Sequence, residues 1–124
     1  MARRAQNSAY AGSALAHLAW VAWRRQHWAE AETQARSALE LLSVTYQWRL
    51  WALWPLLGLA LRRGQVEPAV EYARGILRRE QTPMPDDLAL ALEGALESFA
   101  ASDAATVLRR FRTAAELAQR EGYL

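Results

Sequence analysis

The sequence predicts an all-α protein built from six helices in three antiparallel hairpins. Apolar residues recur at helical spacing along most of the 124-residue chain, as they do in helices that bury one face. No run of alternating β-branched and polar residues, the usual signal of a strand, occurs anywhere in the sequence. The chain also matches itself at a shift of 38 residues, which places Ala31 on Ala69 and Ala35 on Ala73. Self-similarity at such a period indicates stacked helical repeats.

The first hairpin is predicted over residues 8–43. Its first helix covers about 8–25, where large apolar residues such as Leu15 and Leu18 lie at helical spacing. A turn at 26–27 leads to a second helix over about 28–42. The small residues Ala31, Ala35 and Ala38 fall on one face of this helix, with charged residues on the other.

The second hairpin is predicted over residues 47–80. Pro55 leaves two starts open for its first helix, because proline lacks a backbone donor and clashes with the preceding turn. The helix either starts near Ala52, with Pro55 in its first turn, or starts near Gln47 and kinks. Gly64 is expected to end it. The second helix covers about 67–79, and Pro68 suits its first turn.

The third hairpin is predicted over residues 85–121. A proline followed by two aspartates is a typical helix start, so the fifth helix is expected over 85–101. Ser102 is predicted as the N-cap of the sixth helix. That helix is expected to run to about Arg120, where Gly122 stops it. The three hairpins are predicted to form one domain over 1–124.

These units resemble the tetratricopeptide (TPR) repeat, in which two antiparallel helices pair in each unit. The positions that match its pattern are the large apolar residues Leu18 and Leu56, the turn glycine Gly64, replaced by Gln26 and Ser102, the aromatic Trp28, and the small residues Ala31, Ala69, Ala38 and Ala114. The period is four residues longer than in that family, and the third copy has Gly94 where the first two have leucine. The resemblance implies a TPR-like superhelix of three hairpins.

The amino-acid composition of the chain excludes several classes of function. The chain is 52% hydrophobic, enough for a core, and it has no cysteine, which excludes disulfides and thiol chemistry. Its formal charge of +2 is too small for the footprint of a nucleic-acid-binding protein. The longest apolar run, residues 50–61, is too short to span a bilayer. We therefore expect a cytoplasmic protein that contacts neither nucleic acid nor membrane.

No pattern of catalytic residues emerges from the sequence. His17 and His27 are the only histidines, and no carboxylate or cysteine accompanies them at the spacing of metal ligands. Asp86 and Asp87 are neighbours on a helix and point apart. The six glycines form no phosphate loop, and no serine lies in a nucleophile elbow. We expect no enzymatic activity, no cofactor and no metal.

Tryptophan is the unusual feature of the composition, with six residues in the chain. In the TPR family the first helix of each repeat lines a concave face, and the resemblance places ten residues of this chain in such a groove. They are His17, Trp20, Trp23, Arg24, Trp51, Trp54, Leu61, Arg62, Leu96 and Phe99. Two interpretations stay open at this point. The rings pack between the repeats as core, or a ligand, a second copy or another part of a longer protein covers them.

The function that fits these observations is a non-catalytic protein–protein interaction module. The chain resembles helical-repeat segments of bacterial transcription regulators and signalling ATPases, and it is either complete or a fragment of such a protein. We expect it to bind a protein or peptide, as a homodimer or by docking to other domains of a parent protein. Apolar residues on the last helix, Val107, Leu108, Phe111 and Leu117, are expected to face outward. The alternative is a sensor that holds a small hydrophobic ligand or peptide in the aromatic groove.

Overall fold

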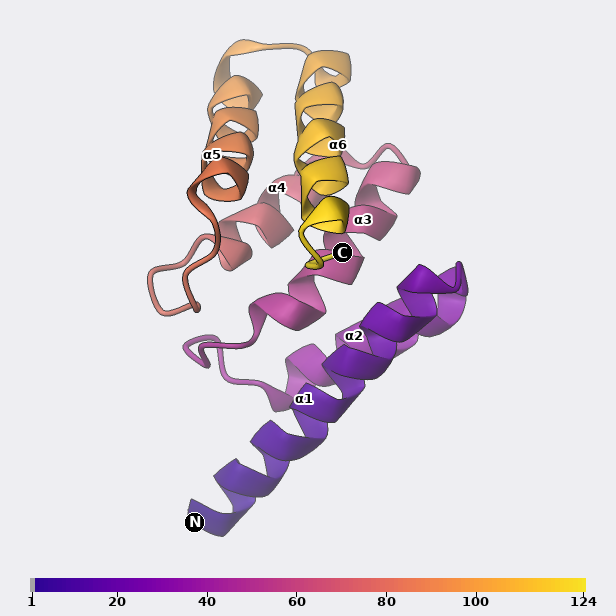
Figure 1. Cartoon of the computed structure of the whole chain (residues 1–124), viewed down its shortest axis with the longest axis vertical. Helices are drawn as coiled ribbons and strands as arrows, with labels where there is room; N and C mark the ends of the chain where they lie inside the picture. Colours follow the sequence, from indigo (N-terminus) through magenta and orange to yellow (C-terminus); the bar gives the residue numbers. More distant parts are fainter. Residues whose placement is uncertain (1) are drawn as a thin grey trace.

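A computed structural model describes residues 2–124 of the chain, with side chains from Asn7 onward. This part of the chain forms six helices and no strand, which confirms the all-α prediction (Figure 1). The helices are α1 (Ala2–Arg24), α2 (Trp28–Leu41), α3 (Leu50–Arg62), α4 (Val66–Ile76), α5 (Asp86–Ala101) and α6 (Ala104–Arg120). Within residues 2–124, none of them combines the length and the apolar character that crossing a bilayer requires.

The helices pair as three hairpins, but the third hairpin does not stack as a regular repeat would. Helices α1 and α2 both pack against α3, and α3 pairs with α4. In a regular stack α5 would come next to α3. Instead α6 lies beside both α3 and α4, while α5 contacts α4 and α6 (Figure 1). The expectation that helices one, three and five share one face is therefore wrong.

The turns of the first two hairpins have the same backbone geometry. Gln26 and Gly64 are 38 residues apart, and both have positive φ, at 63° and 66°. The residue after each donates its N–H to a carbonyl five residues back, at 2.9 Å in both turns. Gln26, which aligns with Gly64, thus takes the left-handed conformation that glycine adopts more readily. Gly122 closes α6 in the same way, with φ at 88°.

The third turn is built differently. Ser102 has an extended backbone, with φ at −130°, and it ends α5 instead of starting α6. Asp103 is the N-cap of α6: its carboxylate accepts the Thr106 N–H at 2.8 Å, which lowers the Asp103 pKa. The prediction of Ser102 as N-cap is therefore wrong by one residue. This turn therefore lacks the left-handed residue that follows the two earlier first helices.

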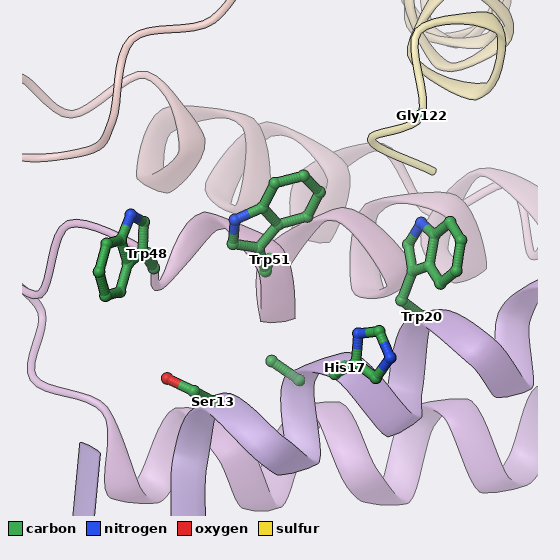
Figure 2. Close-up of a pocket in the computed structure, with 7 residues that line it drawn as sticks. Ser13, His17, Trp20, Trp48, Trp51 and Gly122 are labelled. Atoms are coloured by element: carbon green, nitrogen blue, oxygen red, sulfur yellow. The ribbon is translucent and has the colours of Figure 1, made fainter. Parts of the chain in front are cut away.

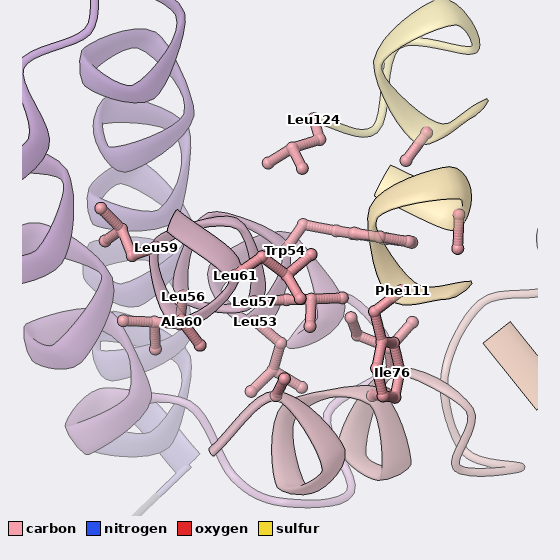
Figure 3. Close-up of a cluster of buried hydrophobic side chains, with 14 of the residues drawn as sticks. Leu53, Trp54, Leu56, Leu57, Leu59, Ala60, Leu61, Ile76, Phe111 and Leu124 are labelled. Carbon is pink, nitrogen blue, oxygen red and sulfur yellow. The ribbon is translucent and has the colours of Figure 1, made fainter. Parts of the chain in front are cut away.

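Helix α3 is the centre of the structure, and every residue from Ala52 to Leu61 is buried. Figure 3 shows its side chains leaving in all directions, with Leu59 toward the first hairpin and Trp54 toward α6. The helix begins at Leu50, between the two predicted starts, and continues through Pro55. A turn over 47–49 precedes the helix. Because Pro55 has no N–H, one hydrogen bond is missing within the helix, but the helix does not end there.

A buried glutamine fixes the start of α3 from far along the chain. The Gln81 side chain accepts the Leu50 N–H at 2.7 Å and donates to the Tyr46 carbonyl at 2.8 Å. Thr82 donates its backbone N–H to the Gln47 carbonyl at 2.9 Å. These bonds hold the segment after α4 against the loop before α3. Helix α4 itself ends at Ile76 instead of near residue 79.

The apolar positions that match in the repeat alignment differ in how deeply they are buried. Leu18 and Leu56 align in the sequence, yet Leu18 is 49% exposed and Leu56 is 1% exposed. Helix α1 belongs to the hairpin at one end of the stack, and the described residues leave the face that carries Leu18 open. The contact positions Ala31 and Ala69 are fully buried, as predicted. Helix α1 also begins earlier than predicted, at Ala2 instead of near Ser8.

The expected outward apolar face of α6 faces inward. Val107 and Phe111 are buried in the core, and Leu108 and Leu117 are partly buried against it. With Ala114 and Ala118 they form an apolar stripe at helical spacing. This stripe packs onto α3 and α4. Helix α6 therefore covers the side of α3 that α5 would cover in a regular stack of repeats.

Close packing of α1 on α3 depends on Gly58. A Cβ atom at this position would lie 2.5 Å from the Trp23 ring. We expect Gly58→Ala to lower the free energy of unfolding by about 1–3 kcal/mol, because the buried ring has to move. The matched control is Gly94→Ala, since a Cβ there meets nothing within 4 Å. Alanine favours helix, so this control should gain about 0.5–1 kcal/mol in denaturant titrations. Equal free energies of unfolding for the two variants would contradict the close packing of Trp23 on Gly58.

The end of α6 brings two acidic side chains together. Burial and the neighbouring Asp87 carboxyl raise the pKa of Glu121 above its ordinary value. A raised acid pKa means that folding is favoured while Glu121 is protonated, and this contribution is lost as pH rises through the raised pKa. We expect Glu121→Gln to melt above wild type at neutral pH, with the gap closing in acid. Glu97→Gln on the exposed face of α5 is the control. Thermal melts in which both variants behave alike at every pH would refute this.

Candidate functional site

The ten residues predicted for an aromatic groove fall into separate environments. Trp23, Trp54 and Leu61 are buried, with exposed fractions of 7%, 0% and 4%. All three belong to the core. Trp54 lines neither of the two clefts described below, whereas Trp23 and Leu61 also line the cleft next to α6. The physical reason is the third hairpin, because α6 and the residues after it cover the face of α3 that a regular stack would leave open.

The residues after α6 complete this cover. The Tyr123 ring stacks on Trp51 with a centroid distance of 5.1 Å and an interplanar angle of 4°. It also lies 6.3 Å from the Trp54 ring, and Leu124 is fully buried. Sequence reasoning missed Tyr123 and Leu124. The available signal was Gly122, which turns the chain back toward the core immediately before an aromatic residue.

An aromatic cleft of about 410 Å³ remains open between α1, the start of α3 and the turn after α6 (Figure 2). Its walls combine three tryptophans, one histidine and three small residues. They are Ser13, Ala16, His17, Trp20, Trp48, Trp51 and Gly122. Three of the ten predicted residues, Trp23, Leu61 and Arg62, line a second cleft, and at this one the structure brings together three others, His17, Trp20 and Trp51. It adds Trp48, which is 46% exposed and precedes α3.

Two polar atoms at the aromatic cleft have no hydrogen-bond partner. They are the indole Nε1 of Trp20 and the hydroxyl Oγ of Ser13, and both are buried. Buried polar groups in proteins are nearly always paired, so each unpaired one needs a reason. An indole N–H can only donate, whereas a hydroxyl can donate or accept. Because the chain encloses both atoms, the surface that the cleft offers is mainly aromatic and apolar.

The predicted arginines are used within the fold. Arg24 lies over the Trp20 ring at 4.9 Å and donates to the Gln119 carbonyl at 3.2 Å. This contact joins α1 to α6. Arg62 lies 3.9 Å from the centre of the Trp28 ring. It lines a second, more polar cleft of about 480 Å³ between the first turn, α3 and α6. Both arginines therefore also have a structural role, beyond the rim of a groove.

The two α5 residues of the predicted groove do not join it. Leu96 is partly buried against the core, and Phe99 is 38% exposed near the end of α5. Because α6 lies between α5 and α3 in the stack, neither residue can line a face shared with α3. Their assignment to the groove is wrong for the same reason as the third repeat.

The chemistry available at the aromatic cleft is that of binding. His17 is its one titratable side chain, and the ring stacks on Trp20 with centroids 6.1 Å apart. Among the described residues, no group of three or more acidic, histidine or cysteine side chains is placed to hold a metal ion. The cleft offers ring faces, apolar walls and hydrogen-bonding atoms, which suit a flat apolar group.

Comparison of the chain with protein-family models, with curated proteins and with solved structures returns no significant match.

Proposed function

We propose that the chain is a non-catalytic protein-interaction module that binds its partner through the aromatic cleft. The observation that carries the proposal is Trp48, a large ring left 46% exposed beside two other tryptophans in a cleft of about 410 Å³. Tryptophan is among the residue types enriched at binding hot spots, and such rings dominate affinity when a partner covers them. The partner is a protein or a peptide.

The burial of Trp23, Trp54 and Leu61 changes the choice of partner. The expected homodimer relied on an exposed face that included these side chains. With them inside one chain, the apolar area available to a second copy is smaller. We therefore favour a segment of another protein, or another domain of a longer parent protein, over a homodimer. A cytoplasmic, regulatory role in transcription or signalling is the context that the TPR-like resemblance suggests.

A sensor for a small hydrophobic molecule is the second candidate function. The volume of the aromatic cleft is within the range of small-molecule sites, about 300–1,000 Å³. Its tryptophan rings and small residues suit a flat apolar molecule. The exposed position of Trp48 favours the protein partner, because a small ligand would leave much of this ring in water.

Selection of short random peptides on the immobilised chain tests the proposal. We expect enriched peptides whose affinity falls by about tenfold or more in Trp48→Ala, the loss typical of a hot-spot ring. Leu90→Ala is the matched control, because Leu90 is an exposed apolar residue on α5 outside the cleft. Affinities measured by calorimetry should be unchanged in this control. Peptides that bind both variants equally, or no enrichment at all, would contradict the proposal.

A further inference from the structure

We propose that the more polar cleft between the first turn, α3 and α6 binds an acidic side chain of the partner, with Arg62 and Arg112 as the groups that hold its carboxylate. We call this site the arginine cleft, after these two of its lining residues. The inference rests on the proposed function in one respect, that the partner is a protein or a peptide. It adds a second contact, outside the aromatic cleft, and the chemistry of that contact.

The chain itself holds both arginines in place at the arginine cleft. The Arg62 guanidinium lies 3.9 Å from the centre of the Trp28 ring, and Arg112 donates from Nη2 to the Leu61 carbonyl at 3.1 Å. A ring contact uses the face of a guanidinium, and a single hydrogen bond uses one of its five N–H groups. Both arginines are also exposed. Most of their donors are therefore unused by the protein and within reach of a ligand.

Neither of these two arginines has an acidic partner within the described chain. Four other arginines each pair with a glutamate, and they are Arg36, Arg63, Arg74 and Arg78. Among the residues whose side chains are described, Arg62 and Arg112 form no such ion pair, although Glu116 lines the same cleft. Two like charges that line one cleft repel each other, and an anion bound between them relieves this repulsion. The arginine cleft therefore suits an anion better than a cation.

The charges of the lining side chains favour an anion with a single charge. Arg62, Arg112 and Glu116 are the charged side chains of the cleft, so two positive charges stand against one negative charge. A carboxylate balances the excess, whereas a phosphate monoester would bring a second negative charge beside Glu116. A carboxylate also accepts two parallel hydrogen bonds from the planar fork of a guanidinium. We therefore assign the site to an aspartate or glutamate side chain.

The rest of the arginine cleft provides apolar surface beside the two charges. Trp28 and Ala115 line the cleft and are half-buried, so part of each side chain remains for a ligand to cover. Covering apolar surface is favourable, and it also removes water from the neighbouring ion pair, which strengthens the attraction. We therefore expect the acidic residue of the partner to have an apolar neighbour in its sequence.

An NMR titration of the indole N–H signals tests the inference, because the tryptophans report which cleft is occupied. Trp28 lines the arginine cleft, whereas Trp48 lines the aromatic cleft. The probe is a leucine–glutamate dipeptide, acetylated and amidated at its ends, so that the glutamate carboxylate is its only charge. We expect a saturable shift of the Trp28 signal and none of the Trp48 signal. The same dipeptide with glutamine should bind about tenfold more weakly.

Three results of this titration would overturn the inference. The first is the absence of a saturable shift at Trp28, and the second is equal affinity for the glutamate and glutamine dipeptides. The third is tighter binding of inorganic phosphate than of the glutamate dipeptide at the same signal, which would assign the arginine cleft to phosphate instead of a carboxylate.

Two variants and one control connect the binding to the named side chains. Arg62→Gln and Arg112→Gln should each weaken binding of the glutamate dipeptide about fivefold and leave the glutamine dipeptide unchanged. Arg110→Gln is the matched control, because Arg110 is exposed on α6 and lines neither cleft. Arg112→Gln also removes the bond to the Leu61 carbonyl, so Arg62→Gln is the decisive variant. An Arg62→Gln protein that keeps the full preference for glutamate would refute the site.

The outcomes also separate this inference from the proposed function. Selected peptides whose affinity depends on Trp48 but not on Arg62 would overturn the carboxylate site and leave the interaction module standing. A preference for glutamate that depends on Arg62, without any enriched peptide, would overturn the proposed function and leave the carboxylate site standing. We expect selected peptides that carry an acidic residue and lose affinity in both Trp48→Ala and Arg62→Gln.

Discussion

Between Ala52 and Leu61, helix α3 has no face that meets water, and four helices and the last residues of the chain are needed to cover it. Each fully buried leucine in it contributes about 1.5–3 kcal/mol, so leaving one face open would cost more than the fold can lose. The need to cover every face of α3 determines where the other helices pack. The first hairpin covers one side, with Gly58 allowing the Trp23 ring to lie close, and α4 covers another. The remaining side is covered by α6 and Tyr123.

Much of the local structure could be predicted from the sequence, because it depends on residues close together in the chain. The six helices, the turns at 26–27 and Gly64, and the small contact residues Ala31 and Ala69 all follow from spacing and turn chemistry. The start of α3 did not follow, because its partner is Gln81, 31 residues away. No local pattern marks such a bond.

The orientation of the third hairpin could not be predicted for a related reason. Helices α5 and α6 both carry an apolar stripe, so either of them could pack on α3. The choice depends on the turn between them, where Ser102 is extended and Asp103 caps α6. It also depends on Gly122, which returns Tyr123 to the Trp51 ring. As a result, Trp54 belongs to the core and Trp48 lines the aromatic cleft. Their equal spacing from Trp51 in the sequence does not distinguish them.

The most direct test of this arrangement is a nuclear Overhauser spectrum of the aromatic side chains in solution. The structure predicts cross-peaks between the rings of Tyr123 and Trp51, which are stacked at 5.1 Å. These cross-peaks establish that the chain after α6 lies on α3. Cross-peaks from Phe99 of α5 to Trp54 of α3, with none from Tyr123 to Trp51, would instead establish a regular stack of three hairpins. That result would contradict both the cover of α3 and the shape of the aromatic cleft.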